Sequence, residues 1–132
     1  MTIVVGVAPA DTGLSAVTEA ARQARWRATP VVVVTVVDPA AFLDPAHADD
    51  LDLGVVTEHL STRGVRNSVR QIIDNSPAAD VILALARDFG AALIVLGLHR
   101  RSWVAGSSLG TTTRSIVLAA PCPVLIVPEV EA

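Results

Sequence analysis

The residues best suited to binding chemistry lie in one stretch, residues 97–113, which reads GLHRRSWVAGSSLGTTT. Its glycines and serines let the backbone turn tightly and approach another molecule closely. Residues 110–112 come at the start of an expected helix, where free amide donors and the helix dipole favour an anion. Arg100 and Arg101 add guanidinium groups that can pair with phosphate bidentately. The stretch therefore predicts an anion-binding loop, although an ordinary Gly/Ser-rich connection would have the same composition.

Catalysis would need more than this loop offers. Hydrolysis of a phosphate ester requires a base and a metal held by a carboxylate, and His99 is the one titratable base in the stretch. We expect His99 to be a solvated surface histidine. A set of Asp and His residues between positions 44 and 59 has the residue types that bind metals, but it fits a solvated acidic face better. These residues are Asp44, His47, Asp49, Asp50, Asp52 and His59. The sequence predicts no catalytic residue, no metal site and no enzyme.

The composition of the chain limits which class of protein it can belong to. The chain has 132 residues, is 52% hydrophobic and carries a net charge of −3, which predicts one α/β domain over residues 1–132 and disfavours nucleic acid as a partner. No apolar run approaches the roughly 20 residues that a membrane span needs, and the N-terminus lacks a basic leader. Cys122 has no partner for a disulfide and is expected to be a small buried hydrophobe. These features indicate a cytoplasmic protein with no membrane contact.

Strands and helices alternate along the chain. Apolar runs predict strands at residues 3–8, 31–37, 93–96 and 123–128, with a half-polar edge strand at 65–73. We expect Asp11 or Thr12 to cap the first helix, Trp26 to cover the sheet edge and residues 39–50 to form a surface loop. Helical spacing predicts these inward-facing residues: Leu14, Val17, Ala21, Ala24, Leu51, Val55, Val56, Leu60, Val81, Ile82, Leu85, Phe89, Ile116, Val117 and Ala120.

This alternation predicts a doubly wound parallel sheet with right-handed crossovers. In such sheets ligands bind beyond the carboxyl ends of the strands, where the strand order reverses. That rule brings together the ends of the first and fourth strands, at Ala8-Pro9 and Gly97-Leu98. The glycine-rich loop therefore begins at the position where a ligand site is expected.

Three segments resemble the universal stress protein family: residues 33–38 (VVTVVD), 89–97 (FGAALIVLG) and, most specifically, 120–128 (APCPVLIVP). The resemblance covers essentially the whole chain. It implies a five-stranded parallel sheet of order 3-2-1-4-5 with helices on both faces, and dimers through the last strand. It also implies a role in stress survival rather than a defined reaction. Some members of the family bind ATP or AMP, and others bind no nucleotide.

The nucleotide-binding members carry a motif that this sequence keeps in part. The motif is Gly, two residues, Gly, nine residues, then Gly followed by Ser or Thr. Here Gly97 and Gly110-Thr111 fit the frame, but Arg100 stands in place of the second glycine. Ala8 stands where those members carry an acidic residue, and Ala10 where a serine is expected. A lost hydrogen bond to a charged partner weakens binding by about one to two orders of magnitude.

Two functions follow from this pattern. The first is a non-catalytic, dimeric stress-response module that acts through protein partners and has a degenerate cleft with no tightly bound cofactor. The alternative is an ATP- or AMP-binding switch that uses the loop, with Val36 against the base; a flavoprotein-like electron-transfer domain fits less well. The candidate cleft residues are Ala8, Val36, Leu96, Gly97, Arg100, Gly110, Thr111 and Thr112.

The last strand suggests how two copies would associate. Prolines at both ends suit an edge strand, yet residues 124–127 are apolar throughout. An exposed apolar edge pairs readily with another chain. We therefore expect a homodimer through this strand.

Overall fold

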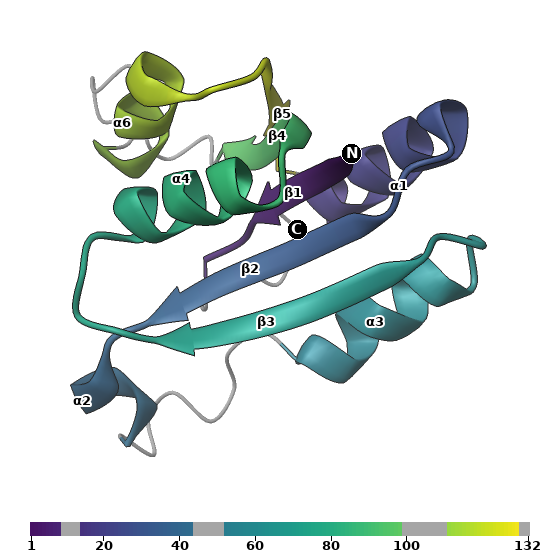
Figure 1. Ribbon diagram of the computed structural model, residues 1–132. Helices are drawn as coiled ribbons and strands as arrows, with labels where there is room; N and C mark the ends of the chain where they lie inside the picture. The colour runs from purple at the N-terminus through teal and green to yellow at the C-terminus, as the bar shows by residue number, and fades with distance from the viewer. Residues whose placement is uncertain (9–13, 44–51, 99–110, 130–132) are drawn as a thin grey trace.

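The computed structural model describes residues 1–8, 14–43, 52–98 and 111–129, without the side chains of residues 41 and 42. Its five strands form one sheet of order β3-β2-β1-β4-β5 (Figure 1). Every neighbouring pair is parallel, which confirms the predicted doubly wound sheet and its strand order. The strands are β1 (Thr2–Gly6), β2 (Val31–Val37), β3 (Asn67–Ile73), β4 (Ala91–Leu98) and β5 (Val124–Pro128).

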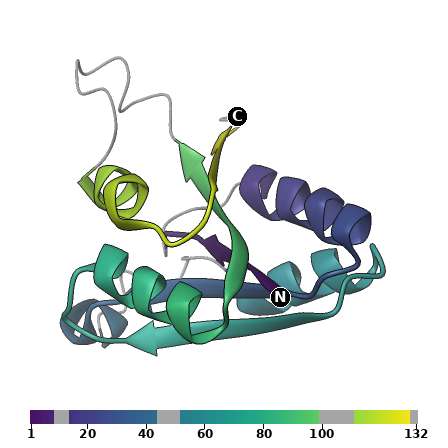
Figure 2. The ribbon, with the colours of Figure 1, turned by 45° about the horizontal axis from the view of Figure 1, so that its top comes forward.

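Helices cover both faces of the sheet. The helices α1 (Ser15–Arg27) and α3 (Leu53–Ser61) lie on one face, and α4 (Ala78–Asp88) and α6 (Thr111–Ala119) on the other (Figure 2). A short helix, α2 (Pro39–Phe42), directly follows β2. The prediction of a continuous surface loop over residues 39–50 is therefore wrong for α2, while residues 44–50 lie outside the described part of the chain.

The two faces bury two separate apolar clusters. Alternating side chains of the central strands divide between them, as the two-residue period of a strand requires. Ile3, Val5 and Val33 pack under α1 and α3, whereas Val4 and Ile94 pack under α4 and α6. β-Branched residues suit such a doubly covered parallel sheet, and the predicted core strands are confirmed in it.

Several predicted contacts are wrong in detail. Trp26 is 80% exposed and does not cover the sheet edge, while Val55 and Val117 are 48% and 43% exposed. Val55 precedes the fully buried Val56, and Val117 follows the fully buried Ile116. Successive helical residues are rotated by about 100°, so only one of each pair can point fully inward.

His59 connects the two helices of the α1 face. Its Nε2 lies 2.8 Å from Thr18 Oγ1 on α1, and its Nδ1 lies 3.3 Å from a guanidinium nitrogen of Arg63. Because arginine only donates, Nδ1 accepts and the proton of the neutral ring resides on Nε2, which donates to Thr18. Partial burial, and second the charge of Arg63, lower the pKa of His59. The folded protein therefore prefers the neutral ring.

Acidification is expected to weaken this connection. A lowered pKa in the folded state means that the unfolded chain binds more protons near the ordinary value of 6.5, so stability falls as pH decreases through the window just below it. We expect urea midpoints of the wild type to decrease between pH 7.5 and 5.5 more than those of His59→Gln. Equal pH slopes in the two proteins would contradict this role. Thr18→Val, which removes the acceptor, serves as the second variant.

Candidate functional site

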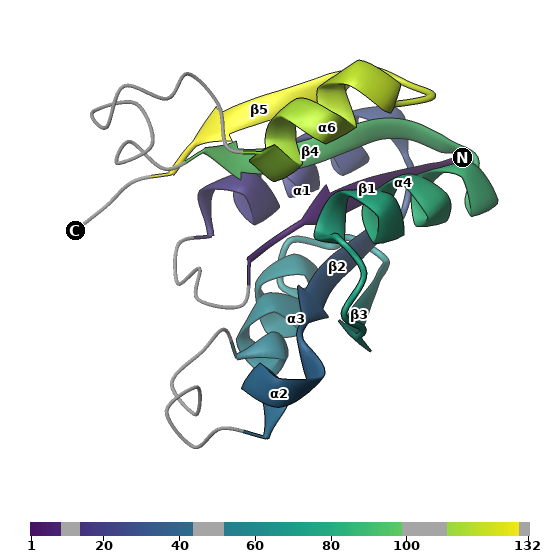
Figure 3. The ribbon, with the colours of Figure 1, turned by 90° about the vertical axis from the view of Figure 1, so that its left-hand side faces the viewer.

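The candidate site lies at the carboxyl edge of the sheet, between β1 and β4. These strands are neighbours, and the chain order reverses on either side of them (Figure 3). Gly6 pairs with Leu96 at the end of β1, and Ala8 follows as an exposed residue. A side chain at Gly6 would come within 2.8 Å of Ile82 Cδ1 and 3.0 Å of Leu96 Cδ2. The glycine therefore lets α4 pack closely against the strand pair that carries the site.

The structure brings part of the predicted residue set to this edge. Leu96 is buried, and Val36 is half-buried against the α4 face. Thr111 and Thr112 are the first residues of α6 and are exposed. The other predicted loop residues lie outside the described part of the chain: His99, Arg100, Arg101 and Gly110.

A carboxylate that the sequence reasoning missed also lies at this edge. Glu129 directly follows β5 and is only 2% exposed. Its backbone N–H donates to Leu98 O at 2.9 Å. Its two carboxylate oxygens accept hydrogen bonds from the first-turn amides of Ser15 and Ala16, each at 3.3 Å. A negative charge is favourable at this helix terminus, because the amide dipoles are directed toward it.

This contact gives the first turn of α1 the acceptors that a capping side chain would supply. The N-cap position of α1 is Leu14, which forms no side-chain capping hydrogen bond. The predicted caps Asp11 and Thr12 lie outside the described residues, and the described helix begins at Ser15. The anionic partner is instead supplied from the opposite end of the chain.

Gly97 makes room for the Glu129 side chain. A Cβ at Gly97 would lie 3.0 Å from Glu129 Cγ and 3.1 Å from its Cδ, and would overlap Oε1. Real Cβ atoms do not approach other atoms so closely. In this chain the first glycine of the expected nucleotide motif therefore accommodates an internal carboxylate on the α1 face.

Comparison with known proteins decides the family. The sequence profile of the Universal stress protein family matches residues 1–128. The chain belongs to this family. It is 29% identical to a universal stress protein of Mycolicibacterium smegmatis over 125 residues, which is 95% of each chain. The resemblance stated from the sequence is confirmed.

Solved structures of the universal stress protein family share the fold. One from Archaeoglobus fulgidus superposes with a TM-score of 0.79 at 22% identity, covering 96% of this chain and 93% of its own. A universal stress protein in complex with cAMP gives a TM-score of 0.75 at 26% identity, covering 98% of both chains. The ligand in the second structure belongs to that protein.

The remaining chemical candidates have structural roles where they are described. Asp52 caps α3, accepting from Gly54 N at 2.8 Å, and His59 bonds to Thr18 and Arg63. Within the described ranges, no three His, Cys, Asp or Glu side chains group as metal ligands would. Burial raises the pKa of the half-buried Cys122 thiol, which fits a packing residue rather than a nucleophile. Nor does any described helix have the length and apolar character needed to cross a membrane.

Proposed function

We propose that this member of the universal stress protein family is a non-catalytic stress-response module whose nucleotide cleft is degenerate. Residues 1–132 form its single domain, it works as a cytoplasmic homodimer, and it acts through protein partners rather than through a reaction. The fold that nucleotide-binding relatives use is retained, while the polar groups that would hold a nucleotide are reduced. Neither a catalytic residue nor a metal ion enters this proposal.

One observation carries the proposal. Ala8 is exposed at the end of β1, at the position where nucleotide-binding members of the family carry an acidic residue. A methyl group offers no acceptor to a ribose or base, and each missing hydrogen bond of this kind reduces affinity by about tenfold or more. Arg100 in place of the second motif glycine adds a long side chain where the backbone would approach phosphate. Both changes act against tight nucleotide binding.

The alternative, an ATP- or AMP-binding switch, is supported by a different observation. Thr111 and Thr112 are exposed at the start of α6, where amide groups and the helix dipole favour phosphate. The cAMP-bound relative shares 26% of its sequence with this chain. In this alternative Gly97, Arg100 and the Gly110–Thr112 turn hold phosphate, and Val36 and Leu96 line the base side.

Dimerisation is supported by the last strand. β5 is an edge strand of the sheet, and residues 124–127 are only half-buried although all four are apolar. On the neighbouring helix, Leu118 is 76% exposed. A second copy pairing along β5 would cover this edge, and sedimentation equilibrium would then give twice the chain mass.

Isothermal titration with ATP and AMP, with and without magnesium, tests the cleft. We expect no micromolar binding by the wild type and measurable binding by the double variant Ala8→Asp, Arg100→Gly. A matched control, Ala84→Asp with Arg114→Gln, makes the same charge change at exposed helix positions. Micromolar binding by the wild type would overturn the proposal in favour of the switch. If neither the wild type nor the double variant bound nucleotide, positions 8 and 100 would not explain the loss of nucleotide binding.

A further inference from the structure

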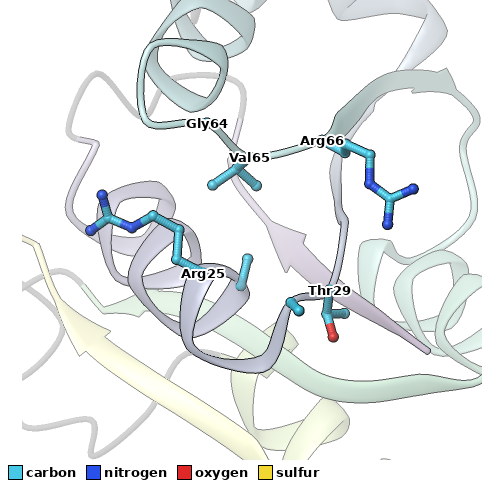
Figure 4. Close-up of a pocket in the computed structure, with 7 residues that line it drawn as sticks. Arg25, Thr29, Gly64, Val65 and Arg66 are labelled. Atoms are coloured by element: carbon cyan, nitrogen blue, oxygen red, sulfur yellow. The ribbon is translucent and has the colours of Figure 1, made fainter.

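A pocket lies at the amino ends of the strands, opposite to the carboxyl ends where the candidate nucleotide cleft lies. Its volume is about 320 Å³, and it lies between the end of α1 and the connection from α3 to β3 (Figure 4). In Figure 1 these connections lie at the amino ends of β2 and β3, whereas the candidate cleft lies at the carboxyl ends. This volume is near the lower limit of ordinary small-molecule sites, about 300 to 1,000 Å³. Because its lining residues lie at the end of α1 and before β3, the pocket is distinct from the candidate nucleotide cleft.

The pocket wall combines an apolar surface with polar backbone. Ala24, Ala28 and Val65 contribute apolar atoms, and Thr29 and Gly64 complete the turns on either side. Ala28 and Gly64 have positive φ angles of 52° and 74°, which turn the chain sharply after each helix. Both turns are held by hydrogen bonds, such as Thr29 N to Ala24 O at 3.0 Å. A rigid wall of this kind suits a compact apolar group.

Two arginines flank this wall. Arg25 comes from the last turn of α1 and Arg66 from the segment before β3, and they lie on opposite sides of the pocket (Figure 4). Neither guanidinium group has a hydrogen bond or ion pair with any residue that the structure describes, and no carboxylate lines the pocket. Two cations beside an apolar hollow are complementary to an anion.

Of the two arginines, only Arg25 is explained by a favourable interaction with the dipole at a helix end. Arg25 lies in the last turn of α1, where a cation is favourable. Arg66 lies beyond the end of α3, and its backbone carbonyl accepts from Val31 N at 2.9 Å in the sheet. Its position on the second side of the pocket therefore has no such account. Arg27 and Arg63 add to the same cationic end of a chain whose net charge is −3.

We propose that this pocket binds a small organic anion, a phosphate or carboxylate attached to a compact apolar group. The apolar group contacts Ala24, Ala28 and Val65, and the oxyanion pairs with Arg25 and Arg66. The two guanidinium groups extend to opposite sides of the pocket (Figure 4). Both side chains are exposed, so in this proposal they turn toward the oxyanion when it binds.

Amide chemical shifts provide the test. The ¹⁵N-labelled full chain is titrated with phenyl phosphate, benzoate, inorganic phosphate and the neutral benzyl alcohol. We expect saturable shifts at Ala28, Thr29, Gly64, Val65 and Arg66 with phenyl phosphate or benzoate, and weaker binding of the other two probes. The preferred probe then distinguishes a phosphate ligand from a carboxylate ligand.

Variants make the outcome decisive. Arg25→Gln with Arg66→Gln is expected to weaken binding about tenfold or more, while Arg114→Gln, an exposed arginine on α6, leaves it unchanged. Equal weakening by Arg114→Gln, equal binding of benzyl alcohol, or shifts without saturation would each overturn the proposal. So would shifts confined to the ends of β1 and β4 and the start of α6.

Discussion

Replacing Glu129 by alanine is expected to lower the free energy of unfolding by about 2–3 kcal/mol. The carboxylate is 2% exposed and accepts from the amides of Ser15 and Ala16. Its removal takes away two charge-assisted hydrogen bonds in a site that water barely reaches, and also the favourable charge at the α1 terminus. The same change loosens the end of β5 from α1, so both ends of the chain lose a constraint.

Urea unfolding followed by circular dichroism measures this effect. Glu129→Gln should fall between alanine and the wild type, because one amide oxygen can still accept while the charge is lost. Glu58→Ala, the same truncation at an exposed position of α3, should change stability by no more than about 0.5 kcal/mol. If Glu129→Ala were as mild as Glu58→Ala, the buried contact would not contribute to stability.

The fold could be predicted from the sequence because its strands are short, apolar and separated by turn residues. β2 matches the predicted bounds, residues 31–37. Gly64 and Gly90 have positive φ angles in the turns that follow α3 and α4. β4 extends beyond the predicted residues 93–96 to Ala91–Leu98, since pairing with β1 and β5 continues past the apolar run. Pairing partners, rather than local composition, set that boundary.

The candidate site was less accessible, because it depends on contacts between distant segments. The sequence places Gly97 and Ala8 at one edge by topology alone, and the structure confirms that placement. The sequence gives no local signal that Glu129 reaches the start of α1, which is more than a hundred positions away in the chain. Leu14 at the N-cap position cannot cap the amides of α1, but this becomes evident only once the structure shows where the helix begins.

Replacing Gly97 by alanine is expected to lower the free energy of unfolding by about 1–3 kcal/mol, as overpacking of a filled site does. The new methyl group would overlap the Glu129 carboxylate. The side chain has two ways to adapt. It can stay and force the backbones of β4 and β5 apart, or it can leave and give up the amides of α1. Either response removes part of the same stabilising contact.

A double-mutant cycle separates this steric cause from the intrinsic cost of alanine in β4. In the Glu129→Ala background the space beside Gly97 is vacant, so Gly97→Ala should cost less than about 1 kcal/mol. The coupling between the two positions should then lie within the range of about 0.5–3 kcal/mol that contacting residues show. Strictly additive effects would mean that Gly97 is required by the strand itself, and that the carboxylate and the motif glycine are independent features of this edge.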